Sequence, residues 1–223
     1  MVREERKEAR RQRTLNAAAT LIRETGSTDF SMVILAGKAK LSPATPYNLF
    51  GSKGAILYAL LNRCLDEISG GAEKAIAHRS PFLRAIRAAA WGASFFVSDP
   101  DFYRPLYRFL LGVEDPVYRP AYMDRSLEYW KFALAEMDSG AVALPKEVDN
   151  DALARQLLIQ FTGALDLWVQ KELDDREFVA QIGYGAGLIL LGIASDEHRE
   201  AILKNMRAQR KQLPKAFSFA QAK

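Results

Sequence analysis

The fold is decided by the stretch from Phe30 to Lys53, FSMVILAGKAKLSPATPYNLFGSK. This stretch predicts two helices separated by a sharp turn. Ser31 is a good N-cap for the first helix, and the apolar residues that follow it are spaced at i, i+3, i+4 and i+7. They are Met32, Leu35, Ala36 and Ala39. Because these residues form one stripe along the helix, we expect them to pack inward.

The second helix is predicted to be short and to start abruptly. After a turn at residues 39–41, Ser42 is the expected N-cap and Pro43 the first helical residue, where its missing N–H is harmless. Leu49 and Phe50 are expected to anchor the helix on the core, which leaves its small first residues outside. We interpret the pair as a DNA-binding helix-turn-helix, because the N-terminal residues of a recognition helix lie nearest the base edges. A helical pair that serves only for packing is the alternative.

The outer residues of the second helix suit different parts of DNA. Ala44 or Thr45 could touch a thymine methyl, and Thr45 or Asn48 could hydrogen-bond to a base. Tyr47 and Lys53 are better suited to phosphate. Ser52 and Lys53 also open the next helix, whose free backbone N–H groups favour a phosphate oxygen. The full predicted DNA-binding set is Ser31, Lys40, Ser42, Pro43, Ala44, Thr45, Tyr47, Asn48 and Lys53.

The spaced pattern S-M-x-x-(I/L)-A-x-x-A-x-(V/L)-S-x-x-T-x-Y-x-x-F-x-S-K resembles the DNA-binding domain of TetR-type (tetracycline-repressor-like, TetR/AcrR) bacterial transcription regulators. The segment Arg13 to Gly26, RTLNAAATLIRETG, is similar to the first helix of that family. Three positions depart from the family pattern. Lys40 stands where Gly is usual in the turn, Pro46 lies inside the recognition helix, and Gly54 stands where Glu is common. Pro46 is expected to remove the first intrahelical hydrogen bond.

The resemblance implies an all-α protein with an N-terminal three-helix, helix-turn-helix domain and a C-terminal helical bundle for ligand binding and dimerisation. We expect the first domain at residues 1–53, the second at residues 54–215 and a loose tail at 216–223. The implied function is a ligand-responsive homodimeric transcriptional regulator, a repressor, which binds a palindromic DNA operator and is released by an apolar small molecule. A ligand-independent architectural DNA-binding protein is the alternative.

Charge is unevenly distributed along the chain. The 223 residues include 49% hydrophobic and 26% charged residues, which is typical of soluble globular proteins. The net charge of +4 divides into +5 for residues 1–53 and −1 for the remainder. This asymmetry fits an electrostatic footprint for nucleic acid. Residues 1–12 interleave arginine with glutamate and are interpreted either as an arm that contacts DNA or as a solvated tail.

The cysteine content and the hydropathy indicate a cytoplasmic protein with no membrane partner. Cys64 is the single cysteine and lies on an apolar helical stripe, which predicts a buried structural thiol. The charged N-terminus lacks the apolar run of a signal peptide. The uncharged residues 178–195 reach the lower length limit for a membrane span, but their glycines and Gln181 favour a helix buried in protein.

Beyond residue 51 the sequence predicts seven helices. The first is long enough to connect the DNA-binding domain mechanically to the remainder of the chain. The predicted ranges are 52–77, 82–97, 102–111, 117–137, 151–173, 175–194 and 196–212.

The helices predicted at residues 151–173 and 175–194 are strongly apolar. A helix that is apolar on all sides must be buried, and two such neighbours suggest a four-helix bundle formed by a dimer. Gly183 and Gly187 are spaced at i, i+4 and would permit close approach of another helix. The predicted interface residues are Leu157, Leu165, Phe178, Ile182, Gly183, Ala186, Gly187 and Leu190.

No arrangement of residues in the sequence indicates catalysis. The two histidines, His78 and His198, lie outside any spacing typical of metal ligands, and no nucleophile is paired with a base. We therefore predict that the chain is not an enzyme and needs no cofactor or metal.

The middle of the chain is rich in aromatic residues, which predicts a concave apolar site for a small molecule. For any single residue of this kind, core packing is the commoner role. Asp166 stands out because it lies among apolar neighbours, and a carboxylate taken out of water needs a partner in the dimer or on the ligand. The predicted ligand-binding residues are Trp91, Phe95, Tyr107, Leu110, Tyr122, Trp130, Phe161, Ala164, Asp166 and Trp168.

Overall fold

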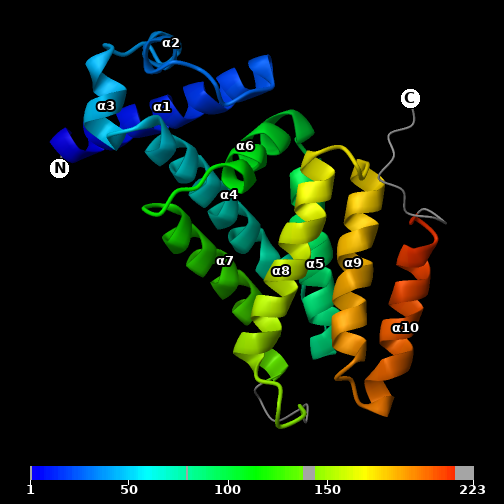
Figure 1. The fold of residues 1–223 in the computed structure, drawn as a ribbon. Coiled ribbons are helices and arrows are strands. Elements are labelled where there is room, and N and C mark those ends of the chain that lie inside the picture. Colours follow the sequence, from blue (N-terminus) through cyan, green and yellow to red (C-terminus); the bar gives the residue numbers. More distant parts are fainter. Residues whose placement is uncertain (1, 79, 138–143, 214–223) are drawn as a thin grey trace, which may run out of the picture. The chain divides into compact units, whose positions relative to one another are not determined.

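The computed structural model describes residues 2–78, 80–137 and 144–213, and all of their regular structure is helical (Figure 1). The all-α prediction is therefore confirmed, whereas the expected loose tail at 216–223 lies outside the described residues. The elements are α1 (Val2–Thr25), α2 (Met32–Lys38), α3 (Ala44–Phe50), α4 (Lys53–Ala75), α5 (Pro81–Val97), α6 (Pro100–Gly112), α7 (Arg119–Leu134), a 3₁₀ turn η1 (Ala135–Met137), α8 (Asn150–Val169), α9 (Asp175–Leu191) and α10 (Asp196–Arg210).

Among the helices predicted beyond residue 51, the largest boundary error is at the end of α8, which stops at Val169 instead of Leu173. Lys171 adopts a left-handed conformation with φ of 65°. Its N–H donates to the carbonyl of Trp168 at 3.1 Å, and the N–H of Glu172 donates to the carbonyl of Leu167 at 2.8 Å. This is the Schellman arrangement, which ends a helix by turning the chain back on its last carbonyls. It is usually marked by Gly or Asn, so the sequence carried no signal for it.

The chain forms two compact units, and α4 and α7 each continue from one unit into the other. Unit 1 comprises Met1–Asp66 and Asp99–Tyr122, and unit 2 comprises Glu67–Ser98 and Met123–Lys223. Unit 1 therefore includes α6 in addition to the helix-turn-helix. The expected division into domains at residue 53 stays a prediction.

Unit 1 is built around α1, which packs against α2, α3 and α6. The four residues predicted to face inward from the first helix of the pair are all buried, with Leu35 completely covered. An ion pair fastens α6 to α1, because the Arg23 guanidinium lies 2.7 Å from the Asp99 carboxylate. The same guanidinium lies over the Phe102 ring, 4.5 Å from its centre.

Unit 2 is organised around α9, which packs against α5, α8 and α10. An aromatic cluster in this unit surrounds the ring of Phe161. The centre of this ring lies 5.7 Å from the ring centres of Phe96 and Trp130 and 6.0 Å from that of Phe178. Glycines on α9 allow its neighbours to approach closely. A Cβ atom on Gly185 would lie 2.3 Å from the Gln160 side chain of α8.

Within residues 2–78, 80–137 and 144–213, no helix combines the length with the apolar character that a bilayer crossing requires.

The turn between α2 and α3 depends on one residue in the left-handed region. Lys40 has φ of 54°, its N–H donates to the carbonyl of Gly37 at 3.1 Å, and the N–H of Leu41 donates to the carbonyl of Ala36 at 2.9 Å. This is again the Schellman arrangement, and it requires a positive φ at its central position. The structure thus explains why Gly is the usual residue at this position in the family that the sequence resembles, and why Lys40 costs some stability here.

We predict that Lys40→Gly stabilises the folded protein by about 1 kcal/mol, because glycine adopts the left-handed conformation without steric conflict. For a chain of this length the melting temperature should rise by about 2–4 °C. Lys40→Ala is the matched control, since it removes the same charge but keeps a Cβ atom. Equal melting temperatures for the two variants in calorimetry would contradict the backbone explanation.

Candidate nucleic-acid interface

The α2–α3 pair has the arrangement expected of a helix-turn-helix, and its first helix begins as predicted. Ser31 is the N-cap of α2, and its hydroxyl accepts a hydrogen bond from the N–H of Ile34 at 3.2 Å. Because this hydroxyl satisfies one of the free N–H groups at the start of the helix, it fixes where α2 begins.

The prediction that Ser42 caps the second helix is wrong. Pro43 occupies the N-cap position of α3, with helical dihedral angles and no side-chain cap. The Ser42 hydroxyl instead lies 2.7 Å from the Thr45 hydroxyl, while the N–H of Thr45 donates to the carbonyl of Ser42 at 2.9 Å. The ring of Pro43 already imposes a helical φ, so the first turn forms without a side-chain cap.

Pro46 also behaves differently from the prediction. It is the third residue of α3 after the N-cap, a position whose N–H has no partner within the helix. The missing N–H of Pro46 therefore removes no hydrogen bond from α3. Pro46 is buried, whereas Leu49 and Phe50 are only half-buried. The proline that departs from the family pattern is thus the main apolar anchor of α3.

The residues predicted to contact DNA lie at the surface of unit 1. Thr45 and Lys53 are half-buried, and the remaining seven are exposed. Tyr47 has the most exposed aromatic ring on α3, with 52% of its surface accessible. The surface of α3 from Pro43 to Asn48 is therefore free to enter a groove, apart from the buried Pro46.

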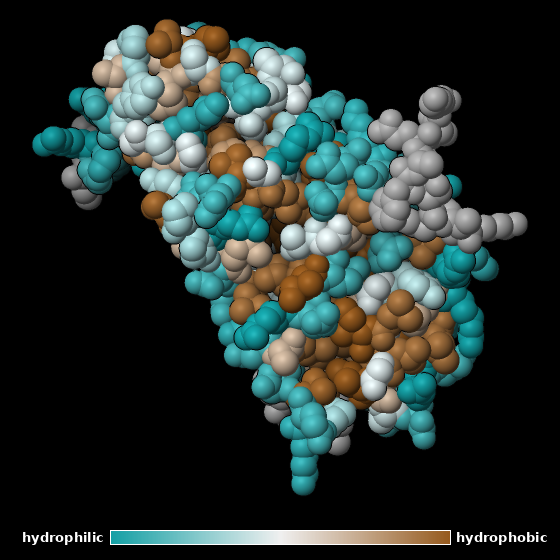
Figure 2. Space-filling view, in the orientation of Figure 1, coloured by the Kyte–Doolittle hydropathy of each residue, from teal (hydrophilic) through white to brown (hydrophobic). Residues whose placement is uncertain are grey.

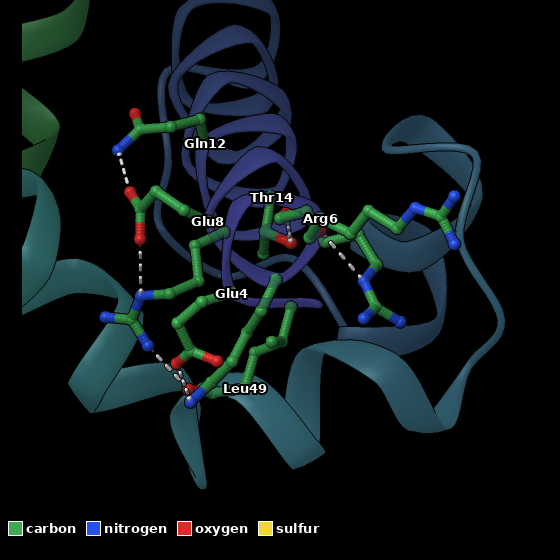
Figure 3. Close-up of polar contacts among 9 residues, drawn as sticks. Glu4, Arg6, Glu8, Gln12, Thr14 and Leu49 are labelled. Carbon is green, nitrogen blue, oxygen red and sulfur yellow. Dashed lines mark hydrogen bonds and ion pairs between the residues drawn. The ribbon is translucent and has the colours of Figure 1, made fainter. Parts of the chain in front are cut away.

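Sequence reasoning missed the residue that holds the far end of α3. Arg11 on α1 donates a hydrogen bond of 2.7 Å to the carbonyl of Leu49 (Figure 3). Its guanidinium also lies 4.3 Å from the centre of the Phe50 ring. Glu8 lies 3.8 Å from the same guanidinium and itself accepts from Gln12 at 2.7 Å. Carbonyls in the last turn of a helix lack intrahelical donors, so Arg11 satisfies one of them. The sequence did contain one signal for this role. Arg11 lies one helical turn before Thr14 and Leu15, which are buried on the inner side of α1.

Residues 2–12 are helical and belong to α1, and those from Arg3 to Arg10 are exposed to solvent, so whether they contact DNA stays a prediction. Their charges are segregated around the helix. Figure 3 shows Arg6 on the opposite side of α1 from Glu8 and Gln12. Arginines at intervals of three or four form an exposed row that has no acidic partner among the described residues. The arginine row consists of Arg3, Arg6, Arg10 and Arg13.

The start of α4 provides a further cation next to the helix-turn-helix. The Ser52 hydroxyl accepts a hydrogen bond of 3.1 Å from the N–H of Ala55, so Ser52 caps this helix. Lys53 is held loosely, because its Nζ lies 4.0 Å from the Asp29 carboxylate and 5.8 Å from the centre of the Phe30 ring. An ion pair with this exposure and distance contributes little to stability, which leaves Lys53 available to an outside anion.

The structure separates the predicted ligand-binding residues into two groups. Tyr107, Leu110 and Tyr122 belong to unit 1, where the two tyrosine hydroxyls lie 2.9 Å apart. Burial raises the pKa of Tyr107 well above its usual value, so its hydroxyl stays neutral. The remaining seven belong to unit 2, where they are buried or half-buried except Asp166. They are Trp91, Phe95, Trp130, Phe161, Ala164, Asp166 and Trp168.

Several residues of the unit 2 group have fixed roles in packing. The indole N–H of Trp91 donates to the carbonyl of Ile68 at 3.0 Å, and that of Trp168 donates to Asp175 at 2.8 Å. Asp166 does not lie in an apolar interior, because it is exposed on α8. The expectation that its carboxylate is removed from water is therefore wrong for the single chain: its apolar sequence neighbours point to the other side of the helix.

All eight residues predicted for the dimer interface are buried within the chain itself. Gly187 lies against α10, where an added Cβ would come within 2.6 Å of the Met206 side chain. Gly183 faces the Gln209 side chain of the same helix, with a corresponding distance of 3.2 Å. The close approach that these glycines permit is thus used by the chain's own α10.

A different apolar surface is exposed on the same two helices. Ile159 on α8 and Leu188 on α9 are 56% and 51% exposed, and Figure 2 shows apolar residues gathered over the parts of these helices drawn lowest in the view. Gly163 and Asp166 continue the outward side of α8. We call Ile159, Gly163, Asp166 and Leu188 the outer face. Large apolar side chains this exposed on neighbouring helices are typical of a protein interface.

Comparison with known proteins gives no match to a protein-family model and none to a curated protein. Solved structures do match. The TetR-family regulator PfmR from Thermus thermophilus is 25% identical, with a TM-score of 0.54, 82% of this chain covered and 99% of the other. A TetR transcriptional regulator from Rhodococcus sp. RHA1 is 17% identical, with a TM-score of 0.67 and coverage of 85% and 100%. SmeT, the repressor of the Stenotrophomonas maltophilia multidrug efflux pump SmeDEF, is 18% identical, with a TM-score of 0.62 and coverage of 83% and 91%.

The chain thus has an N-terminal helix-turn-helix followed by a helical domain, and the matches extend over most of each neighbour. Its fold is that of the TetR-family transcriptional regulators, which confirms the resemblance seen in the sequence. These neighbours are regulators rather than enzymes, in agreement with the prediction that the chain is not a catalyst.

Proposed function

We propose that this protein is a TetR-type transcriptional regulator that binds a palindromic DNA operator as a homodimer. The observation that supports this most directly is the exposed surface of α3 from Pro43 to Asn48, set on the buried Pro46 and held at its end by Arg11. Two-fold symmetry would place two recognition helices about 34 to 36 Å apart, or a multiple of that distance, on successive major grooves. An unbiased search for genomic sites bound by the protein would test this, and sites without an inverted repeat would contradict it.

In this proposal base reading and phosphate binding are divided between α3 and its surroundings. Ala44 and Thr45 lie at the start of α3, where small side chains allow close approach to base edges. The pairing of the Thr45 hydroxyl with Ser42 fixes its direction before DNA arrives. Tyr47, Lys40 and Lys53 surround these residues and suit phosphate, which positions the protein without specifying sequence.

We predict that Thr45→Val and Lys53→Ala affect DNA binding in different ways. Thr45→Val retains a methyl group but loses the hydroxyl, so it should change the preference between operator variants by about 1–3 kcal/mol. Lys53→Ala should weaken all duplexes by a similar factor and reduce the dependence on salt by about one counterion. Titrations over a panel of single-base variants at several salt concentrations measure both effects. If Thr45→Val weakened binding to all operator variants equally, Thr45 would not be a base contact.

The arginine row is proposed to extend the DNA contact beyond α3. The spacing of Arg3, Arg6, Arg10 and Arg13 places them on one side of α1, and Figure 3 shows Arg6 opposite Glu8. A row of arginines without acidic partners in the described part of the chain attracts a polyanion, and nearby acids on the same side would have weakened that attraction. Because Arg11 joins this part of α1 to α3, the row is rigidly connected to the recognition helix.

We predict that Arg6→Gln combined with Arg10→Gln lowers the slope of log affinity against log salt by about 1.8, if each arginine neutralises one phosphate. Shortening the duplex outside the inverted repeat should weaken the wild type more than this variant. Arg176→Gln combined with Lys204→Gln is the control, since it removes equal charge from exposed positions of unit 2. A slope that falls equally in both variants would show a general effect of charge instead of contact.

The homodimer is proposed to form through the outer face instead of the eight residues predicted from the sequence. Ile159 and Leu188 are already exposed on α8 and α9, so two chains could bury them in a four-helix arrangement without rearranging either core. In this proposal Gly183 and Gly187 allow α10 to pack closely against α9 within each chain.

We predict that Ile159→Glu combined with Leu188→Glu yields a folded monomer that binds the operator weakly, because charges would be buried across the interface. Light scattering measures the mass, and circular dichroism confirms that the helices remain. Val117→Glu is the control, since Val117 is 71% exposed but lies in unit 1. A folded double variant that remains dimeric would place the interface elsewhere.

Control by an apolar small molecule and action as a repressor are the remaining parts of the proposal. The aromatic cluster around Phe161, with Phe96 and Trp130, supplies the kind of lining that apolar ligands prefer. The repressor SmeT shares the fold, which supports the same direction of control here. A ligand would release the operator only by preferring a dimer geometry that DNA does not.

The alternative is an architectural DNA-binding protein that responds to no ligand. The two functions are distinguished by the fluorescence of Trp91 and Trp130 together with operator affinity during a screen of apolar compounds. A compound that changes both supports a regulator. Broad coverage of DNA without discrete sites, and without any response to compounds, would support the architectural protein.

A further inference from the structure

A groove in unit 1 lies next to Lys53 and is unrelated to the aromatic cluster of unit 2. It has a volume of about 470 Å³, within the range of small-molecule sites. One wall is the connection between α1 and α2, residues 26–29, and the other is α6. We call it the α6 groove.

One side of α6 forms a continuous wall. Pro105, Arg108, Phe109 and Gly112 all line the groove, and their spacing of i, i+3, i+4 and i+7 places them on one stripe of the helix. The ring of Phe109 is held in place by a T-shaped contact with Tyr58 at 5.7 Å. The apolar part of the wall is therefore already formed without a ligand, which reduces the cost of ordering it on binding.

Two glycines keep the groove open. Gly112 on one wall and Gly26 on the other would each place a Cβ atom with nothing within 4 Å. At Gly26 the backbone itself explains the residue, because its φ is 64°. Gly112 has no positive φ and no crowded neighbour, so neither the backbone nor the packing requires a glycine there. The space next to Gly112 belongs to the groove.

The charges of the groove favour an anion. Arg108 and Lys53 line it together with a single acid, Asp29. Asp29 is 91% exposed at its side chain and lies 4.0 Å from the Lys53 Nζ, so it is a weak competitor for that cation. A carboxylate carried by a ligand could replace it. Arg108 already interacts within the chain, and its guanidinium has five N–H donors, so it could add a charge-assisted hydrogen bond to the same carboxylate.

We infer that the α6 groove binds a small organic acid, with its carboxylate at Lys53 and Arg108 and its apolar part on Phe109, Pro105 and Val113. This inference rests on the proposed DNA-binding function in one respect only: Lys53 is also the proposed phosphate contact. A carboxylate on Lys53 neutralises the charge that would otherwise hold DNA. The acid and the operator therefore compete for one ammonium group, and this control operates without the aromatic cluster.

The first experiment measures binding on the full-length protein without DNA, by ligand-observed NMR, with phenylacetate as the probe. Phenylacetamide has nearly the same shape without the charge and should bind about tenfold more weakly or not at all. Inorganic phosphate tests the apolar wall, and it too should bind more weakly than phenylacetate. Equal binding of the acid and the amide would overturn the inference, as would equal binding of phosphate.

Variants then locate the site. Arg108→Gln should weaken phenylacetate about tenfold, and Gly112→Leu should abolish binding by filling the groove. Arg155→Gln and Gly70→Leu are the controls, because Arg155 is an exposed arginine of unit 2 and Gly70 is a helical glycine with open space around it. Both controls should bind like the wild type. Unchanged binding by Arg108→Gln and Gly112→Leu, with folded spectra, would overturn the site.

The second experiment adds DNA. Saturating phenylacetate should weaken operator binding by the wild type about tenfold and should have no effect on Lys53→Ala, whose DNA binding is already reduced. An equal effect on both proteins would overturn the competition at Lys53. Failure of the wild type to bind any operator would contradict the proposed function instead, because binding of the acid is established on DNA-free protein.

Discussion

A helix of seven residues is not stable in water by itself, and the candidate DNA-reading surface of this protein is such a helix. Forming the first turn of a helix costs more conformational free energy than its hydrogen bond provides. Short helices therefore persist only where tertiary contacts stabilise them. In α3 these contacts come from both ends. Pro46 is buried near its start, and Arg11 binds the Leu49 carbonyl and the Phe50 ring at its finish. The position of every candidate DNA contact on α3 depends on these attachments.

The sequence predicted the helices well because their signals are local. The stripe from Met32 to Ala39 and the cap at Ser31 are found in the structure as expected. The errors occurred where backbone conformation departs from the usual residue preference. Lys171 takes a left-handed φ that glycine normally supplies, so the helix end at Val169 carried no sequence mark. A Pro at the N-cap likewise made the capping role of Ser42 unnecessary.

The choice of partner for a helix face could not be predicted from the sequence. Gly183 and Gly187 correctly indicated that another helix approaches α9 closely, but spacing along one helix does not identify the neighbour. That neighbour is α10, whose own sequence is strongly charged and gave no reason to expect it against an apolar helix. Only the burial of Ile202 and Met206 on its inner side reveals the packing. For the same reason, the sequence did not predict that Ile159 and Leu188 are exposed, because their neighbours in the sequence are apolar. Only the fold shows it.

Lys53 is the residue at which the proposed DNA contact and the proposed organic-acid site meet. Its ammonium group is bound weakly within the chain, since Asp29 is exposed and 4.0 Å away. A strong internal ion pair would have made Lys53 unavailable to both outside anions, whereas a fully solvated lysine would lack the apolar wall of α6 beside it. Thermodynamic linkage makes competition at such a group reciprocal: an acid that weakens the operator must itself be weakened by the operator to the same extent. The response of the protein would then depend on the ratio of acid concentration to its affinity, and no change in the shape of unit 2 would be required.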